Sequence, residues 1–576
     1  MKKADRVFIN AKVYSVLLDG SEVRGEALAV KNGKIVFIGT NKGAERYFKG
    51  AEITDCKGNS LLPSFSDARM NISQSILRFG LCDLTMTLDP TLSTPEDAVE
   101  EIKRRLIFYS KKHSELKVIR GAGFSPNWFE GELGGKIRLI TKKDLDSAVS
   151  DRPVVIISDD AYSAVFNSKA LEIANINKST PEYEGGIIRR DENGEPDGYV
   201  QGSSVIMKIF HLIPFSELTI GEYKQSLLDA QKYLLKSGFT LVSDYQPYRM
   251  GYLALAELAR ENKLHFRING SFHVNDETRE RDYDNALYEK HKWNYKDMIK
   301  VDMASFDLDG NSPYLKEPYN LEFNKASNLK EDYRGDLLWN ISHFEESVDK
   351  FVKKGFNIHV SASGGEAVRL ASQAIIKAQN NNKKKYEKKN LRNTISELFL
   401  ADQEEMKSMG ENKIIAAFLP IFSRENTITS PLYLQMLGKK RMERFNCQNS
   451  FVKNGVICSS GSYFPLNMPD ALGGIETSIT RKVSRNDSIY PLYRDLKFNI
   501  PLPEECISLK EAIKDWTING AYQLHREKIT GSLEVGKSAD LVILNGDIES
   551  VSPSDISVLK VEETIFKGIT CYKFAH

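Results

Sequence analysis

Apolar runs of strand length alternate with amphipathic stretches of helix length from about residue 70 to residue 525. Short apolar runs rich in β-branched residues predict buried strands, and apolar positions three or four apart predict helices packed on them. In a chain of this length the alternation favours a βα barrel. The expected strands are 118–121, 153–158, 240–243, 299–302, 356–360 and 456–459, and the expected helices include 216–237, 250–261, 345–354 and 365–377.

The two ends of the chain consist instead of short apolar runs joined by turn residues. Near the start, the runs 27–31 and 34–39 flank the pair Asn32-Gly33. Both central positions of a two-residue hairpin need positive φ, which Asn and Gly adopt at low cost, so this pair predicts a β-hairpin. Near the end, 531–544 and 561–572 predict a turn and further strands.

Composition narrows the class of protein without identifying it. The chain has 576 residues, 41% hydrophobic and 27% charged, with a formal net charge of +1. Such a balance creates no global field for nucleic acid or an anionic membrane, so neither is expected as a partner. We expect a cytoplasmic protein, because no signal peptide and no apolar run of membrane-spanning length is found. Its scattered cysteines predict reduced thiols rather than a disulfide framework: Cys56, Cys82, Cys447, Cys458, Cys506 and Cys571.

One run, 380–390, is dominated by Asn and Lys. We interpret it as a solvated helix end or loop, with a binding site for an anionic partner as the alternative. The chain has no Gly-x-Ser-x-Gly elbow and no Gly-x-x-x-x-Gly-Lys-Ser/Thr loop. Chemistry of the α/β-hydrolase or P-loop type therefore has no support.

The segment Pro63-Ser64-Phe65-Ser66-Asp67, followed by Arg69 and Asn71, is the most informative motif. It resembles the barrel entry of the amidohydrolase superfamily, whose pattern is Pro-Gly-Phe-x-Asp-x-His-x-His. The tail 531–542, Gly-Ser-Leu-Glu-Val-Gly-Lys-Ser-Ala-Asp-Leu-Val, is similar to a tail signature of the same superfamily. Further short motifs, such as those at 167–171, 238–244 and 461–465, make the chain similar, over nearly its whole length, to the branch that contains N-substituted formamide deformylases.

This resemblance implies an α/β fold, a (β/α)8 TIM-like barrel with a composite β-sandwich built from both chain ends. The implied domains are residues 1–64 and 528–576 for the sandwich and 65–527 for the barrel. Relatives often form homodimers, so a homodimer is expected. Members of the family use a divalent metal such as zinc to activate water.

The residues at the family's metal and catalytic positions are not the usual ones. Carried over position by position, Arg69 and Asn71 stand for the paired His, Tyr162 for a His, Gly202 for a bridging Glu, Ser361 for a His, Gly365 for an Asp, Glu397 for a His and Tyr463 for the catalytic Asp. A guanidinium cannot ligate a cation. We therefore expect that these motifs are lost and that no metal cofactor is bound.

Three hypotheses about these positions follow. A buried Arg needs a carboxylate partner, so Arg69 is expected to pair with Glu397, with Asp67 as a further partner; the alternative is a solvated Arg69. Tyr162 and Tyr463 either hydrogen-bond a ligand or fill the space of the metal. A shifted register would place His359 instead of Ser361 at a ligand position.

Two functions remain open. The first is an amidohydrolase-like pseudoenzyme, which binds a small molecule in the barrel mouth or serves a partner through its surface. The second is an active hydrolase of carbon–nitrogen bonds other than peptide bonds, an amide or formamide for example. It would use relocated ligands or metal-independent chemistry, with Arg69, Asp67, Asp244 and Glu397 as candidate catalytic residues. Fold alone cannot decide between them.

Overall fold

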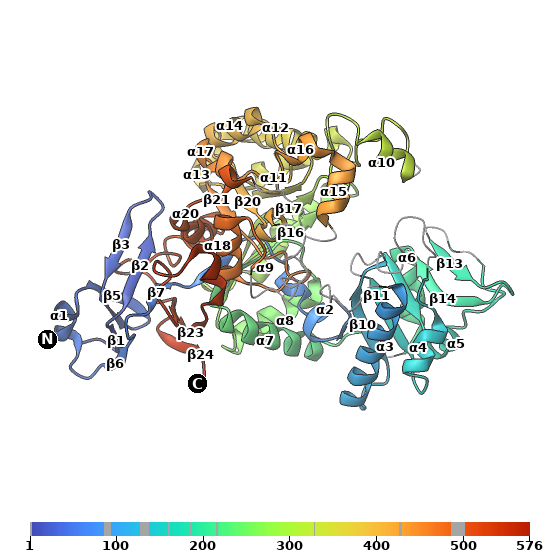
Figure 1. Cartoon of the computed structure of the whole chain (residues 1–576), viewed down its shortest axis with the longest axis horizontal. Coiled ribbons are helices and arrows are strands. Elements are labelled where there is room, and N and C mark those ends of the chain that lie inside the picture. The colour runs from blue at the N-terminus through green and yellow to red at the C-terminus, as the bar shows by residue number, and fades with distance from the viewer. Residues whose placement is uncertain are drawn as a thin grey trace. The chain divides into compact units, whose positions relative to one another are not determined.

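The computed structural model of the chain divides into two compact units (Figure 1). The first comprises Met1–Ile72, Gln231–Tyr248 and Ala256–His576, and the second comprises Ser73–Ala230 and Arg249–Leu255. The residues that the structure describes are 3–85, 94–126, 138–158, 162–181, 183, 186–214, 217–310, 312–327, 329–424, 429–484 and 502–575.

The first unit contains a parallel sheet of eight strands, in the order β21-β20-β19-β18-β17-β16-β15-β8. The backbone N–H of Ala68 donates to the carbonyl of Ser460 at 2.9 Å, which joins the two end strands and nearly closes the barrel. The predicted TIM-like fold class is thereby confirmed. Its strands are β8 (Phe65–Asp67), β15 (Phe239–Asp244), β16 (Arg267–Val274), β17 (Ile299–Asp307), β18 (Asn357–Ala362), β19 (Thr394–Glu397), β20 (Ile415–Phe418) and β21 (Cys458–Ser460).

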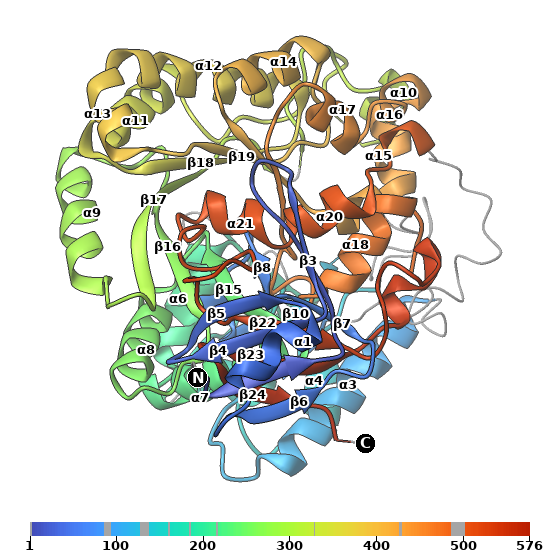
Figure 2. The same cartoon turned by 90° about the vertical axis from the view of Figure 1, so that its left-hand side faces the viewer.

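The described helices from residue 220 onward are α7 (Ile220–Lys236), α8 (Arg249–Arg260), α9 (Glu280–Trp293), α10 (Leu321–Ala326), α11 (Ile341–Lys354), α12 (Gly365–Asn381), α13 (Lys383–Lys389), α14 (Gln403–Glu411), α15 (Thr429–Leu437), α16 (Lys439–Met442), α17 (Gln448–Lys453), α18 (Ala471–Thr480), α20 (Leu509–Asp515) and α21 (Ile518–Gln523). Of these, α9, α11, α12, α17, α20 and α21 contact barrel strands, and Figure 2 shows α11 to α14 outside the sheet. The run 380–390 forms the end of α12 and the mostly exposed α13, as the solvated interpretation predicted.

Helix α11 illustrates how local sequence sets an element. The side chain of Asn340 accepts a hydrogen bond from the backbone N–H of His343, and Gly355 ends the helix at φ 82°. Asn caps a helix start well, and Gly tolerates the left-handed end. Phe344, Val348 and Phe351 lie on one face and pack into a hydrophobic core cluster, with outward residues of the barrel strands.

Both chain ends meet in one sheet of six strands, ordered β24-β23-β22-β7-β2-β3, beside a four-stranded sheet ordered β5-β4-β1-β6 (Figure 2). Asn32 and Gly33 have φ of 51° and 72°, so the predicted hairpin is confirmed. The strands are β1 (Arg6–Ile9), β2 (Lys12–Val16), β3 (Glu22–Gly25), β4 (Ala27–Lys31), β5 (Lys34–Gly39), β6 (Glu52–Asp55), β7 (Ser60–Pro63), β22 (Leu541–Leu544), β23 (Val561–Phe566) and β24 (Ile569–Lys573), with α1 (Asn41–Ala44) after β5.

The second unit has its own six-stranded sheet, ordered β13-β14-β12-β11-β10-β9. Two expected barrel strands, 118–121 and 153–158, belong to it and not to the barrel, so that part of the prediction was wrong. A short buried apolar run looks the same whichever sheet it joins. The strands are β9 (Cys82–Asp83), β10 (Ile119–Phe124), β11 (Val154–Ser158), β12 (Ser163–Phe166), β13 (Ile187–Arg190) and β14 (Pro196–Gln201), and the helices are α2 (Ile76–Phe79), α3 (Pro95–Lys112), α4 (Lys142–Ala148), α5 (Ser168–Ile173) and α6 (Ser203–Leu212).

Within the described ranges, every helix is too short or too polar to cross a membrane.

Candidate functional site

The carboxyl ends of the eight barrel strands define the barrel mouth, where active sites of this architecture lie. His273, Ser305, His359 and Thr394 are register partners across β16 to β19, so their side chains point to the same side of the sheet. Because the alternate residues pack into the outer core, this polar row faces the barrel interior. Asp307, two residues beyond Ser305, continues the row toward the mouth.

Arg69 follows β8 and is buried, with 3% of its surface exposed. Its Nη2 lies 3.4 Å from Glu397 Oε1, which confirms the predicted ion pair. The guanidinium carbon lies 3.7 Å from the centre of the Tyr245 ring and 4.9 Å from that of Tyr463. Burial would lower the pKa of Arg69, but the surrounding groups, Glu397 among them, raise it above its usual range. The mouth therefore holds a permanent positive charge against two aromatic rings.

Asp67 is not a second partner of this guanidinium. Its carboxylate accepts hydrogen bonds from the backbone N–H groups of Arg69 and Ser462, at 3.2 and 3.1 Å. Together with the approach of Gly461, where an added Cβ would lie 2.6 Å from that of Arg69, these bonds hold the ends of β8 and β21 together. Asp67 thus positions the Arg69 backbone.

The backbone is unusual at two residues that touch Arg69, Glu397 at the end of β19 and Tyr463 after β21. Glu397 has φ of 77° and Tyr463 has φ of 66°. Such values are uncommon for residues with a side chain and persist where surrounding contacts enforce them. Glu397 is fixed further by the Ser363 hydroxyl, which donates to Oε2 at 2.8 Å. The Arg69 pair is therefore built on strained, tightly held strand ends.

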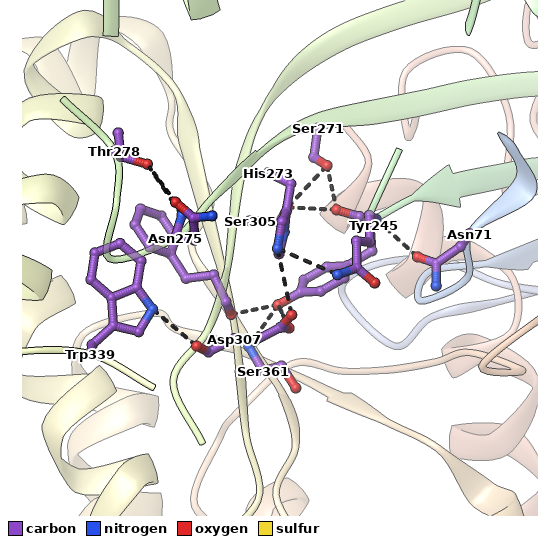
Figure 3. Close-up of polar contacts among 12 residues, drawn as sticks. Asn71, Tyr245, Ser271, His273, Asn275, Thr278, Ser305, Asp307, Trp339 and Ser361 are labelled. Atoms are coloured by element: carbon purple, nitrogen blue, oxygen red, sulfur yellow. Dashed lines mark hydrogen bonds and ion pairs between the residues drawn. The ribbon is translucent and has the colours of Figure 1, made fainter. Parts of the chain in front are cut away.

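Tyr245 lies across the barrel interior (Figure 3). Its hydroxyl lies 2.5 Å from the Phe306 carbonyl and 2.9 Å from Asp307 Oδ1, either of which can accept its proton, and it accepts from the backbone N–H of Ser361 at 3.0 Å. Its ring packs edge-on against His359, with centroids 4.7 Å apart. One side chain therefore ties together the ends of β15, β17 and β18 beneath Arg69.

Tyr245→Phe is expected to lower the free energy of unfolding by about 1–3 kcal/mol, because the Ser361 N–H is left buried without its acceptor. Thermal denaturation of the purified variant measures this. The matched control is Tyr47→Phe, since the Tyr47 hydroxyl reaches its carbonyl partner only at 3.5 Å. Equal midpoints for the two variants would contradict the bracing role of Tyr245.

His273 and Asp307 are the more accessible polar groups of the mouth, with side chains 25% and 29% exposed. His273 Nε2 lies 3.6 Å from Asp307 Oδ2 and 3.4 Å from Gln246 Nε2, and its Nδ1 lies 3.2 Å from Ser305 Oγ. Burial lowers the pKa of His273, and Asp307 opposes that shift. The imidazole is therefore largely neutral at neutral pH and is available to accept a proton or a hydrogen bond.

Asp309 is a further buried carboxyl group, beside Asp67. Asp309 accepts from the backbone N–H groups of Ser363, Gly364 and Tyr314, at 2.8 to 2.9 Å, and so fixes the loop after β18. Burial raises the pKa of Asp309 to about 7 and that of Asp67 to about 7. Both titrate near neutral pH.

Several predicted site residues have structural contacts at the mouth. Asn71 accepts from the Gln246 backbone N–H at 2.9 Å and so links the loops after β8 and β15 (Figure 3). Asp244 is buried at the end of β15, and Gly365 begins α12. His359 is fully buried, its pKa lies well below the usual range because of burial and of Arg69, and neither ring nitrogen has a hydrogen-bond partner among the described residues.

Tyr162 and Gly202 belong to the second unit and not to the eight-stranded sheet. The backbone N–H of Gly202 donates to the carbonyl of Tyr162 at 2.9 Å, so the two positions are neighbours. Tyr162 is 53% exposed, and Gly202 is the residue that precedes α6. Neither comes from a barrel strand.

Sequence reasoning missed Tyr245, His273, Asp307 and Asp309. The strand expected at 299–302 continues to Asp307, and the alternation Ser305-Phe306-Asp307-Leu308-Asp309 was the signal that could have shown this. His273 lies on a strand that the sequence analysis did not include. Tyr245 directly follows the predicted candidate Asp244. It belongs to the site because its side chain lies across the barrel interior, which no local pattern shows.

Over the described part of the chain, no group of three or more His, Cys, Asp or Glu side chains is arranged to hold a metal ion.

Comparisons with known proteins agree with this architecture. The family model of the amidohydrolase family matches residues 52–572. The Bacillus subtilis protein named "Putative amidohydrolase YtcJ" is 25% identical over 571 residues, covering 97% of this chain and 98% of the relative. The N-substituted formamide deformylase of Arthrobacter pascens is 22% identical over 596 residues, covering 99% of this chain and 98% of the relative.

Among solved structures, an uncharacterized metal-dependent hydrolase from Pyrococcus horikoshii superposes with a TM-score of 0.69 at 19% identity, covering 95% of this chain and 99% of that chain. This likeness supports the fold. Since the family model spans most of the sequence, the chain belongs to the amidohydrolase family.

Proposed function

We propose that this chain is an amidohydrolase-like protein that binds a small molecule at the barrel mouth without the metal-dependent hydrolysis of its family. The single observation that carries the proposal is the guanidinium of Arg69, buried against Glu397 and between the rings of Tyr245 and Tyr463. The family's divalent cation would lie next to this group, since Arg69 stands at one of its ligand positions.

The residues present do not fit that cation. Two unit charges 4 Å apart interact by about 4 kcal/mol at the effective dielectric of a protein site, and a divalent ion beside Arg69 would double this repulsion. Glu397, the carboxylate that could offset it, is already paired with Arg69 and bonded to Ser363. A site arranged in this way favours the guanidinium over a metal.

Loss of the metal removes the chemical basis of the family reaction. Amide hydrolysis on this scaffold requires a cation that lowers the pKa of bound water from 15.7 toward about 7, and a group that moves protons. Tyr463, at the position of the proton-transfer residue, has its pKa raised by Glu397 and by burial, so it stays neutral. Binding without turnover is the function that these side chains support best.

The second candidate is a hydrolase that acts on non-peptide carbon–nitrogen bonds without the metal. Its support comes from the partly exposed His273 and Asp307, which could move protons at the mouth, and from full-length relatives that include a deformylase. Arg69 would then stabilise negative charge on the substrate. Fold similarity alone does not raise this candidate above the first.

Metal analysis tests the proposal. Protein purified without chelator is expected to contain far less than one equivalent of zinc, iron or manganese per chain, and added zinc is expected to give no stoichiometric binding. Mass spectrometry of the metal content measures this, with N-formyl and N-acyl amines as substrates in parallel. One tightly bound equivalent of zinc with chelator-sensitive hydrolysis would overturn the proposal.

The double variant Arg69→His, Asn71→His restores the family's paired histidines but not the other ligands. It is expected to show no amide hydrolysis, because a catalytic metal needs further protein ligands to stay bound. Turnover of N-formyl amines in the presence of zinc measures this. Recovered turnover would mean that the remaining ligands lie elsewhere in the chain.

A further inference from the structure

His273 and Asp307 face one another as two hydrogen-bond acceptors. The tautomer of His273 follows from its neighbours. Ser305 Oγ lies 2.5 Å from the carbonyl oxygen of Tyr245, which can only accept, so the hydroxyl proton of Ser305 is directed there. We therefore assign Ser305 Oγ as the acceptor of His273 Nδ1–H. The neutral ring therefore presents the lone pair of Nε2 to Asp307 Oδ2, 3.6 Å away.

The carboxylate of Asp307 is only half satisfied. Its Oδ1 lies 2.9 Å from the Tyr245 hydroxyl, whereas Oδ2 faces His273, with no Lys or Arg ion pair to Asp307 in the described chain. Gln246 offers one N–H to Nε2, at the long distance of 3.4 Å. What the pair lacks is a donor, and because both side chains are about a quarter exposed, a ligand can supply one.

The charges around the mouth favour a cation in this position. Arg69 is offset by its own partner Glu397. Asp307 adds negative charge that no Lys or Arg ion pair balances among the described residues. A protonated amine is attracted by such a field, whereas a carboxylate ligand would be repelled by Asp307.

We propose that His273 Nε2 and Asp307 Oδ2 form the head-group subsite of the barrel mouth, and that the ligand it takes is a small organic ammonium ion. The ammonium donates one N–H to the imidazole and another to the carboxylate. The Tyr245 hydroxyl lies 2.9 Å from Asp307 Oδ1, and Ser305 holds the imidazole through Nδ1, so both side chains are placed before the ligand arrives. The inference rests on the proposed small-molecule site and deepens it.

Three probes of one shape test the charge of the ligand: benzylammonium, benzyl alcohol and benzoate, titrated into the full-length protein by calorimetry. Benzylammonium is expected to bind at least ten times more tightly than benzoate, with benzyl alcohol between them. Asp307→Asn is expected to weaken benzylammonium binding at least tenfold, and Asp307→Glu, which keeps the charge, to restore part of it.

A matched control is available in the pair His343 and Asp276, where Nδ1 lies 2.8 Å from Oδ1 at the surface. Asp276→Asn is expected to leave benzylammonium binding unchanged. Tighter binding of benzoate than of benzylammonium, no saturable benzylammonium binding at millimolar concentration, or an unchanged affinity in Asp307→Asn would each overturn the inference. These outcomes are separate from metal content, so the ammonium subsite can fail while the metal-free barrel stands.

Discussion

Replacing Arg69 by methionine is expected to lower the free energy of unfolding by about 3–5 kcal/mol, because Glu397 is then left as an uncompensated charge in the interior. The side chains of Arg69 and Glu397 are 4% and 10% exposed, so solvent screens the pair little. Urea denaturation of the purified variant measures the change. Loss of the contacts with the Tyr245 and Tyr463 rings adds to the effect.

The double variant Arg69→Met, Glu397→Gln separates the charge from the packing. It is expected to be more stable than Arg69→Met alone, because no buried charge is left unpaired. As a control, Arg24→Met removes an ion pair with Glu549 whose side chains are 53% and 34% exposed, and the change should be within about 1 kcal/mol. If Arg69→Met and Arg24→Met unfolded at the same urea concentration as the natural sequence, the buried pair would not stabilise the mouth.

Asp67→Asn is expected to gain stability relative to the natural sequence as the pH rises from about 5 to 8, by about 2–3 kcal/mol. Burial raises the pKa of Asp67 to about 7. Between the unfolded value near 4 and this folded value, the native state keeps a proton that the unfolded chain has released. The free energy of unfolding therefore falls with rising pH in this window. Asp67→Asn has no carboxyl group at this position, so it lacks this pH dependence.

The quantity to measure is the difference between the thermal midpoints of Asp67→Asn and the natural sequence at each pH. The raw curve of the natural sequence also contains buried histidines such as His359, whose lowered pKa has the opposite sign: their contribution is lost as the pH falls below about 6.5. Asp55→Asn, which replaces an exposed carboxylate, is the control: its thermal midpoint is expected to differ from that of the natural sequence by the same amount at each pH. A constant difference for Asp67→Asn as well would show that Asp67 is ionised throughout.

Parts of the fold and of the site could be predicted from the sequence because the signals for them are local. The Asn32-Gly33 hairpin depends on two residues, and the segment around Asp67 and Arg69 is one continuous motif. The pairing of Arg69 with Glu397 could be expected from chemistry alone, since a buried guanidinium needs a carboxylate. Such inferences need no knowledge of which strand lies beside which.

The rest of the site depends on contacts that local patterns do not encode. Tyr245 acts through its position across the barrel, where its hydroxyl reaches β17 and β18. His273 and Asp307 become a pair only because β16 and β17 are neighbours in register. The runs 118–121 and 153–158 have the apolar pattern of barrel strands, yet they pair in another sheet.

The sequence by itself determined the family of this protein, the hairpin and the presence of several helices, and it placed an arginine after the first barrel strand. Periodicity, turn chemistry and short motifs act over a few residues, so they can be read along the chain. Only the tertiary structure decided which strands close the barrel, that Tyr245 braces its interior, and that two acceptors face each other at its mouth. These features arise from pairing between segments far apart in the chain, such as Arg69 and Glu397, which are 328 residues apart.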